Sequence, residues 1–174
     1  MTTRRIVLAI ACALLAVPAS ADEPKGKSPA LDVEQEGGEP VIVHEGTASF
    51  YGGKFHGRKT ASGERFDQNA STAASKELPL GSKATVTNEE TGQSTDVIIN
   101  DRGPYVKGRV IDLSKKAAED IGITKEDGLA PVRVEVKPSE QPTDEAREKV
   151  EDKAEQTAER LGKPLPNESS GSSR

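Results

Sequence analysis

An aspartate directly after a hydrophobic run is the residue of this sequence best placed to do chemistry. The apolar run 97–99 leads into Asn-Asp101-Arg-Gly-Pro-Tyr105, so Asp101 stands where a strand breaks into a Gly-Pro turn. Strand ends hold catalytic groups over a rigid scaffold, and an apolar wall beside a carboxyl group suits it to general acid catalysis. Alternatively, Asp101 caps the turn or pairs with Arg102 or Arg109, since Asn-Asp and Gly-Pro are ordinary turn chemistry.

A second carboxylate near Asp101 would allow paired-carboxylate work on a glycosidic bond. Glu64 is the candidate, and the small residues before it suit a tight loop. We favour the interpretation that Glu64 hydrogen-bonds loop amides and so supports the active cleft. Asp112 lies two residues before Ser114 and is explained adequately by the chemistry of a helix start.

Metal and thiol chemistry are not expected. The single cysteine, Cys12, lies inside an N-terminal apolar run that we interpret below as a cleaved signal peptide. After cleavage no thiolate would remain for catalysis or metal binding. His44 and His56 are twelve positions apart, and a zinc site would need carboxylate ligands at no recognisable spacing. We therefore expect no metal site.

The composition limits the size of the folded core. Of 174 residues, 33% are hydrophobic and 3% aromatic, which is too little apolar material to fold the whole length, so disordered ends are expected. The net charge is -5, and no basic stripe with interleaved aromatics is present. Nucleic acid is therefore not an expected partner.

The N-terminus has the pattern of a signal peptide spanning residues 1–21. Arg4 and Arg5 precede an apolar stretch at 6–17, and Ala19-Ser-Ala21 fits a small-x-small cleavage site. We expect an exported protein, periplasmic or secreted, with no transmembrane segment after cleavage. The alternative, a lipid anchor through Cys12, ranks second because the apolar run continues past that residue.

Three regions follow the signal peptide. The composition predicts a flexible leader at 22–43 and a folded domain at 44–137. It predicts a charged tail, partly helical or disordered, at 138–174. Within that tail, 143–161 keeps helical spacing with i,i+4 pairs such as Glu145 and Lys149, which favours a solvated, partly frayed helix.

Short strands dominate the predicted domain. One helix is expected between an N-cap at Ser114 and a stop at Gly122. The alternation of valines at 132–136 predicts a half-exposed strand near an edge. The other expected strands are 46–51, 83–88, 94–100 and 109–113, with a hairpin turn at 89–92. Together they predict a mainly β protein, a small barrel with mixed connections.

A set of motifs occurs in a characteristic order. They are Gly46-Thr-Ala-Ser-Phe-Tyr51, Phe55-His-Gly-Arg-Lys-Thr-Ala-Ser-Gly-Glu-Arg-Phe-Asp67, Leu78-Pro-Leu-Gly81, Val86-Thr-Asn88, Asn100-Asp-Arg-Gly-Pro-Tyr105 and Arg109-Val-Ile-Asp-Leu-Ser114. The set resembles the rare lipoprotein A family, relatives of expansins and barwin, over about residues 45–137. The resemblance implies a six-stranded double-psi β-barrel with one or two short helices.

The resemblance also implies a function. Members are endolytic peptidoglycan lytic transglycosylases, which cut the MurNAc-GlcNAc bond of denuded glycan strands without water and leave a 1,6-anhydro end. Asp101 takes the position of the acid that protonates the leaving oxygen and then helps to deprotonate the C6 hydroxyl, and Glu64 that of the cleft glutamate. The implied partner is the peptidoglycan glycan strand, no cofactor is needed, and we expect a monomer.

The sequence departs from the family pattern at one catalytic position. After Thr72-Ala-Ala74 the family carries a histidine, regarded as a catalytic partner, where this chain has Ser75. Serine hydrogen-bonds but does not carry a proton near neutral pH. The alternative function is therefore a non-catalytic peptidoglycan-binding or expansin-like wall module. The tail is too short and too polar to be the SPOR repeat that many members carry, so septal recruitment is not assumed.

Five further residues are candidates for binding substrate. Arg102 and Arg109 either orient the acid and contact acetyl and lactyl groups, or form simple salt bridges, which we favour. Tyr51 and Tyr105 either stack on sugar rings or pack against the barrel. Thr60, in the loop that carries Glu64, completes the set.

Overall fold

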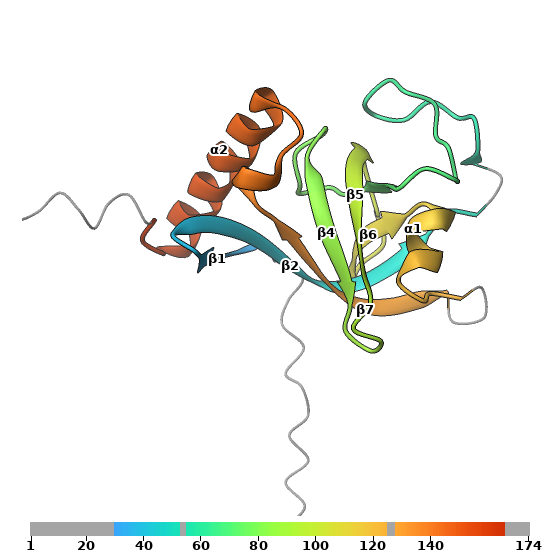
Figure 1. Cartoon of the computed structure of the whole chain (residues 1–174), viewed down its shortest axis with the longest axis horizontal. Coiled ribbons are helices and arrows are strands. Elements are labelled where there is room, and N and C mark those ends of the chain that lie inside the picture. Colours follow the sequence, from blue (N-terminus) through green and yellow to red (C-terminus); the bar gives the residue numbers. More distant parts are fainter. Residues whose placement is uncertain (1–29, 53–54, 125–127, 166–174) are drawn as a thin grey trace, which may run out of the picture.

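The computed structural model describes residues 30–52, 55–124 and 128–165 (Figure 1). The predicted signal peptide and the first part of the predicted leader lie outside these residues. Within the described ranges, the helices are too short or too polar to cross a bilayer.

Seven strands form one sheet, and six of them close into a barrel. In chain order the strands are β1 (Asp32–Glu36), β2 (Glu39–Phe50), β3 (Thr72–Ala74), β4 (Lys83–Asn88), β5 (Ser94–Asp101), β6 (Arg109–Leu113) and β7 (Leu129–Val136). The spatial order is β1-β2-β6-β3-β5-β4-β7, and a further pairing of β2 with β7 closes the sheet. The pairs β2·β6 and β3·β5 are parallel and the other pairs are antiparallel. The predicted six-stranded double-psi β-barrel is therefore confirmed.

Alternating small and branched residues fill the barrel. In β7, Ala130, Val132, Val134 and Val136 are buried between more exposed neighbours, as the period of two along a strand requires. The prediction that this strand lies near an edge is wrong, because β7 pairs with β4 on one side and with β2 on the other. Alternating burial shows that one face of a strand is exposed to solvent. It does not show how many strands pair with it through hydrogen bonds.

The helix α1 (Lys115–Asp120) has the predicted ends. The Ser114 hydroxyl accepts the backbone N–H of Ala117 at 3.2 Å, and Gly122 follows the C-cap with a φ of 76°, where a side chain would be strained. Ala117 and Ile121 are fully buried. The helix therefore fixes the chain directly after β6, the strand that contains Arg109 and Asp112.

The segment predicted as a flexible leader contains strand β1, which is a correction to the sequence analysis. β1 forms an antiparallel hairpin with the start of β2, and Leu31 and Val33 are buried. Four consecutive residues of β2, at 41–44, are buried as well. Burial on successive positions means that both faces of β2 are covered here, one by the barrel interior and one by a second layer.

The second layer is a long helix, α2 (Asp144–Leu161), which packs on β1 and β2 (Figure 1). Its predicted position and the pair Glu145–Lys149, at 2.6 Å, are confirmed. The prediction of a solvated, frayed helix is wrong, because Ala146, Val150, Ala154 and Ala158 are buried against the hairpin. Because alanine side chains are small, the helix approaches the sheet closely along this stripe. A count of large apolar residues in the sequence therefore underestimates how well the helix packs.

The residues that follow α2 lie along strand β1. Ala30 and Leu161 line the same small pocket, and the amide of Gln35 donates to the Pro164 carbonyl at 3.1 Å. The Lys163 ammonium contacts the Asp32 carboxylate. The hairpin and the helix therefore hold each other in place.

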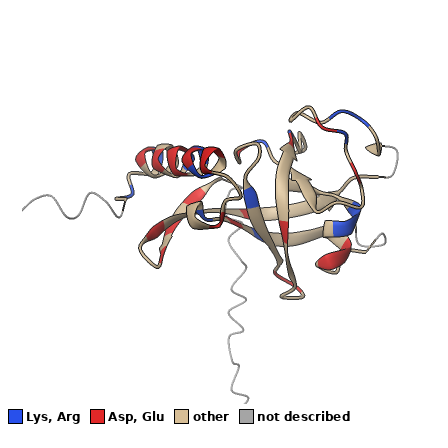
Figure 2. Ribbon diagram, turned by 45° about the horizontal axis from the view of Figure 1, so that its top comes forward, with Lys and Arg blue, Asp and Glu red and all other residues tan. Residues whose placement is uncertain are grey.

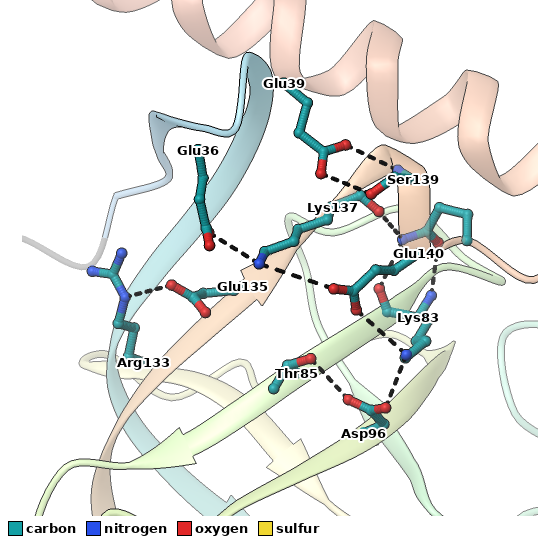
Figure 3. A network of polar contacts seen from close by, with 11 residues as sticks. Glu36, Glu39, Lys83, Thr85, Asp96, Arg133, Glu135, Lys137, Ser139 and Glu140 are labelled. Carbon is teal, nitrogen blue, oxygen red and sulfur yellow. Dashed lines mark hydrogen bonds and ion pairs between the residues drawn. The ribbon is translucent and has the colours of Figure 1, made fainter.

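A polar network joins this layer to the barrel (Figure 3). Lys83 of β4 contacts Asp96 at 2.9 Å and Glu140 at 3.4 Å, and Glu140 belongs to the short 3-10 helix η2 (Pro138–Glu140). Lys137 contacts Glu36 of β1 at 3.0 Å. Burial alone would raise the pKa of Asp96, but hydrogen bonds from Lys83 and Thr85 outweigh it and lower that pKa.

Candidate active site

A cleft of about 380 Å³ lies beside the end of β5, next to Arg109 and Asp112 of β6. The loop of residues 55–69 arches over this end in Figure 1. The cleft is lined by Tyr51, Phe55, Arg58, Lys59, Thr60, Phe66, Asp101, Arg102, Gly103, Pro104, Tyr105, Arg109 and Asp112. Six candidates from the sequence, Asp101 and all five predicted substrate-binding residues, are therefore brought together.

Asp101 is the last residue of β5 and is half-buried in the cleft. Its Oδ1 accepts the backbone N–H of Ala61 at 2.9 Å and that of Arg102 at 2.8 Å, and its Oδ2 faces the Tyr51 hydroxyl at 3.3 Å. The carboxylate is thus held by donors from three segments of chain. Within the described residues it forms no ion pair with Arg102 or Arg109, so the salt-bridge alternative does not describe it.

Tyr51 packs its ring and presents its hydroxyl to Asp101. The ring lies 5.2 Å from that of Phe55 and 4.9 Å from that of Phe66, centroid to centroid. Burial, followed by the negative charges of Asp101 and Asp112, raises the pKa of the phenol well above its ordinary value. Tyr51 therefore remains a hydrogen-bond donor at neutral pH, and its ring forms part of the wall of the cleft.

Tyr105 is placed differently, on the rim of the cleft. Its side chain is 78% exposed, and the Lys76 ammonium lies 5.9 Å from the ring centroid. A flat, exposed aromatic ring beside a cleft offers a face on which a sugar can stack. Of the two tyrosines, Tyr105 has the geometry of a binding surface and Tyr51 that of a supporting group.

The loop over the cleft is a tight hairpin. The Gly57 N–H donates to the Phe66 carbonyl at 2.8 Å, and the Phe66 N–H donates to the Arg58 carbonyl at 2.7 Å. The buried Thr60 hydroxyl donates to the Glu64 carbonyl at 3.0 Å, so Thr60 both lines the cleft and fastens the loop.

The Glu64 side chain is exposed and is not among the groups lining the cleft. Its carboxylate accepts a hydrogen bond of 3.4 Å from the Ser62 hydroxyl, and its backbone carbonyl accepts the Thr60 N–H at 2.8 Å. These contacts lie within its own loop. They match the interpretation that Glu64 holds the loop together.

Ser75 is fully buried and does not line the cleft. Its hydroxyl oxygen accepts the backbone N–H groups of Glu77 and Leu78, each at 3.3 Å, which closes a turn after β3. Its backbone N–H donates to the Asp101 carbonyl at 3.1 Å. Ser75 is therefore a backbone neighbour of Asp101, with its side chain engaged by the turn.

The two arginines have different roles. Arg102 donates from one guanidinium nitrogen to the carbonyls of Ser75 and Leu78, both at 2.9 Å, and so ties the turn after β3 to the end of β5. Arg109 lies 3.5 Å from the Asp112 carboxylate. The predicted salt bridge is present for Arg109, whereas Arg102 bonds backbone oxygens.

Asp112 also lies in the cleft, although its sequence position suggested only a role at the start of a helix. It lies in β6, is 8% exposed, accepts a hydrogen bond from the Ser49 hydroxyl and pairs with Arg109. It lines the same cleft as Asp101, so the site holds two carboxylates. A charged residue inside the otherwise apolar run 110–113 was the signal that could have revealed it.

Residues 43–134 match the family described as "Lytic transglycolase", which is just over half of the chain. The chain belongs to the lytic transglycolase family. Within it, the chain is 53% identical over 94 residues to the endolytic peptidoglycan transglycosylase RlpA of Neisseria meningitidis. It is 56% identical over 94 residues to the probable endolytic peptidoglycan transglycosylase RlpA of Synechocystis.

The similarity to these lytic transglycolase relatives covers just over half of this chain and less than half of each relative. The aligned part is 54% of this chain but 39% of the Neisseria protein and 29% of the Synechocystis protein. Among solved structures, a Clavibacter michiganensis expansin in complex with cellohexaose covers 55% of this chain and 50% of its own, with a TM-score of 0.44 and 18% identity.

Proposed function

We propose that this protein is an endolytic peptidoglycan lytic transglycosylase, exported to remodel the cell wall. One observation supports the proposal above the others. Asp101 lies in the cleft with its carboxylate fixed by three donors, in a chain whose barrel belongs to the lytic transglycolase family. A positioned carboxyl group over an open cleft suits general acid–base work on a glycosidic bond.

The proposed reaction needs one proton carrier and no water. Asp101 donates its proton to the glycosidic oxygen as the bond from MurNAc C1 to that oxygen breaks. The resulting carboxylate then takes the proton of the MurNAc C6 hydroxyl as O6 forms a bond to C1. This gives the 1,6-anhydro end and returns the acid to its starting form.

The surrounding groups support the acid. Tyr51 orients the Asp101 carboxyl group, and Asp112 holds Ser49 and Arg109 in the same cleft. Tyr105 offers a stacking face for a sugar. Glu64 supports the loop that closes over the site, and we expect no cofactor.

The second candidate function is a non-catalytic peptidoglycan-binding module. It is favoured by Ser75, because the residue at the position of the family's histidine cannot carry a proton and points its hydroxyl at the turn. Asp101 would then serve as a binding group.

Mass spectrometry of denuded peptidoglycan incubated with residues 22–174 separates the two functions. A transglycosylase yields 1,6-anhydro glycans that an Asp101→Asn variant does not produce. A folded protein that binds glycan and yields no product is the binding module. If products then appear with Ser75→His, the absent histidine is the cause.

The cellular location is part of the proposal. We propose cleavage after Ala21 and release into the periplasm as a monomer. N-terminal sequencing of the protein from a periplasmic fraction should begin at Asp22, and size-exclusion chromatography should give the monomer mass. Membrane association that is lost with Cys12→Ala would support the lipid anchor instead.

A further inference from the structure

The cationic side chains of this protein are of two kinds. Most Lys and Arg residues of the described chain pair with a carboxylate, and this set comprises Lys83, Arg109, Lys115, Lys116, Arg133, Lys137, Arg147, Lys149, Lys153 and Lys163. Those without a carboxylate partner in the described ranges are Arg58, Lys59, Arg65, Lys76, Arg102, Lys107 and Arg160. All of the second kind except Arg160 belong to the loops around the cleft. The unpaired positive charge is therefore concentrated at the candidate site.

The cleft itself carries an excess of positive charge. Its lining includes Arg58, Lys59, Arg102 and Arg109 against the carboxylates of Asp101 and Asp112. Arg109 is already paired with Asp112, and the Asp101 oxygens face Ala61, Arg102 and Tyr51 donors. Arg58 and Lys59 thus form no ion pair with a carboxylate of the described residues, although the whole chain has a net charge of -5.

The carboxylates of the β1–β2 hairpin, by contrast, are mostly paired: Asp32 with Lys163, Glu36 with Lys137, and both Glu34 and Glu45 with Arg133. Strands β1 and β2 contain Asp32, Glu34, Glu36, Glu39 and Glu45 and neither Lys nor Arg. In Figure 2 the loop of residues 55–69 carries both blue and red, from Arg58, Lys59 and Arg65 and from Glu64 and Asp67. An anionic polymer would be attracted to the mouth of the cleft.

Arg58 and Lys59 are held in a structured part of the loop. The Arg58 guanidinium carbon lies 5.6 Å from the centroid of the Phe55 ring, and Lys59 forms a β-bridge with Arg65. Phe55 in turn packs on Tyr51, the residue that bonds Asp101. The two cations are therefore positioned relative to the acid through a chain of contacts.

We propose that Arg58 and Lys59 bind a carboxylate carried by the glycan strand, so that the enzyme selects anionic strands. The identity of the strand as peptidoglycan rests on the proposed function. A guanidinium matches a carboxylate through two parallel hydrogen bonds, and the lysine adds a point charge. In peptidoglycan such a carboxylate comes either from a lactyl group without a stem peptide or from the stem peptide itself.

The test measures binding with the full chain carrying Asp101→Asn, so that the strand is not cut. The probes are denuded strands with free lactyl carboxylates, the same strands with those carboxylates converted to amides, strands with stem peptides, and neutral chitooligosaccharides. Arg58→Gln and Lys59→Gln are the test variants. Arg160→Gln is the matched control, because Arg160 is exposed, unpaired and on α2.

We expect amidation of the lactyl groups to weaken binding about tenfold, the value of one charged hydrogen-bonded contact. Arg58→Gln should weaken binding of the acid form by a similar factor and abolish the difference between acid and amide. Arg160→Gln should change affinity less than twofold. If peptide-bearing strands bind more tightly and lose that affinity when their own carboxylates are amidated, the stem peptide supplies the carboxylate.

Equal binding of acid, amide and neutral strands would overturn the proposal. In that case 1,6-anhydro products from the unmodified enzyme would show that the proposed function survives. Absence of both binding and products would instead overturn the proposed function, and the carboxylate site with it.

Discussion

At the scale of the residue, Tyr51 is the contact through which the apolar wall acts on the acid. Its ring is packed between Phe55 and Phe66, and its hydroxyl reaches Asp101 at 3.3 Å. Burial and the nearby carboxylates raise the pKa of the phenol above the ordinary value of 10.0. Forming the tyrosinate inside the fold is therefore unfavourable.

This predicts a distinct alkaline titration. The chain has two tyrosines, so a Tyr105→Phe variant leaves Tyr51 as the sole phenol. Its ultraviolet absorbance should show no tyrosinate at pH 10 while the protein stays folded. Because the folded pKa is raised, stability from this group is full below about pH 10 and falls as the pH rises further. Half-ionisation at pH 10 in the folded protein would contradict the buried geometry.

Ser75 leads to a second prediction at this scale. Its hydroxyl accepts two backbone N–H groups in a fully buried turn, so Ser75→Ala should lower the free energy of unfolding by about 1–2 kcal/mol. Urea denaturation measures this, with Ser94→Ala, at an exposed position, as the control. Product formation per folded molecule should be unchanged. A large loss of turnover at unchanged stability would make Ser75 part of the chemistry.

The role of a single residue was predictable where it depends on its neighbours in the sequence. The Gly-Pro turn after an apolar run placed Asp101 in a cleft, because a strand end is a local feature. Asp112 was missed since Ser49, whose hydroxyl donates to it, meets it only through the parallel pairing of β2 with β6. The roles of Tyr51 and Tyr105 were left open for the same reason, because exposure is set by tertiary packing.

At the scale of the element, α2 is a structural layer, which predicts a cost for reducing its buried stripe. Val150 is fully buried against the β1–β2 hairpin, so Val150→Ala should lower the free energy of unfolding by about 1.5–3 kcal/mol. Chemical denaturation measures the change. Gln156→Ala, on the exposed face of the same helix, should change stability by less than about 0.5 kcal/mol. Equal small effects would mean that the helix does not pack on the barrel.

The elements themselves were predictable to different degrees. The strand at 83–88 and the N-cap at Ser114 were predicted from the sequence at their observed positions. Both depend on residues that are adjacent in the sequence. β1 was missed, since its few apolar side chains are buried only when α2 covers them. The apolar face of β1 and that of α2 are each too narrow to be recognised alone. The two segments bury these faces against each other and so form one layer.

At the scale of the whole molecule, closure of the barrel predicts the pattern of amide hydrogen exchange. β7 is paired on both sides, with β2 and with β4, whereas β1 is paired with β2 alone. Hydrogen exchange followed by mass spectrometry should find β7 among the slowest segments and β1 and the loop of residues 55–69 faster. Exchange in β7 as fast as in β1 would mean that the barrel is open between β2 and β7.

The contacts between the two ends of the described chain have a consequence for how this fold can be rearranged. Residue 30 and the end of α2 share one pocket, on the layer formed by the β1–β2 hairpin and α2. Chain ends that lie close together permit circular permutation, and exposed turns accept new termini. A linker from residue 165 that runs back along β1 to residue 30, with the chain opened at the exposed turn 89–92, keeps every strand in its place. The order of the segments along the gene is thus separable from the architecture of the barrel.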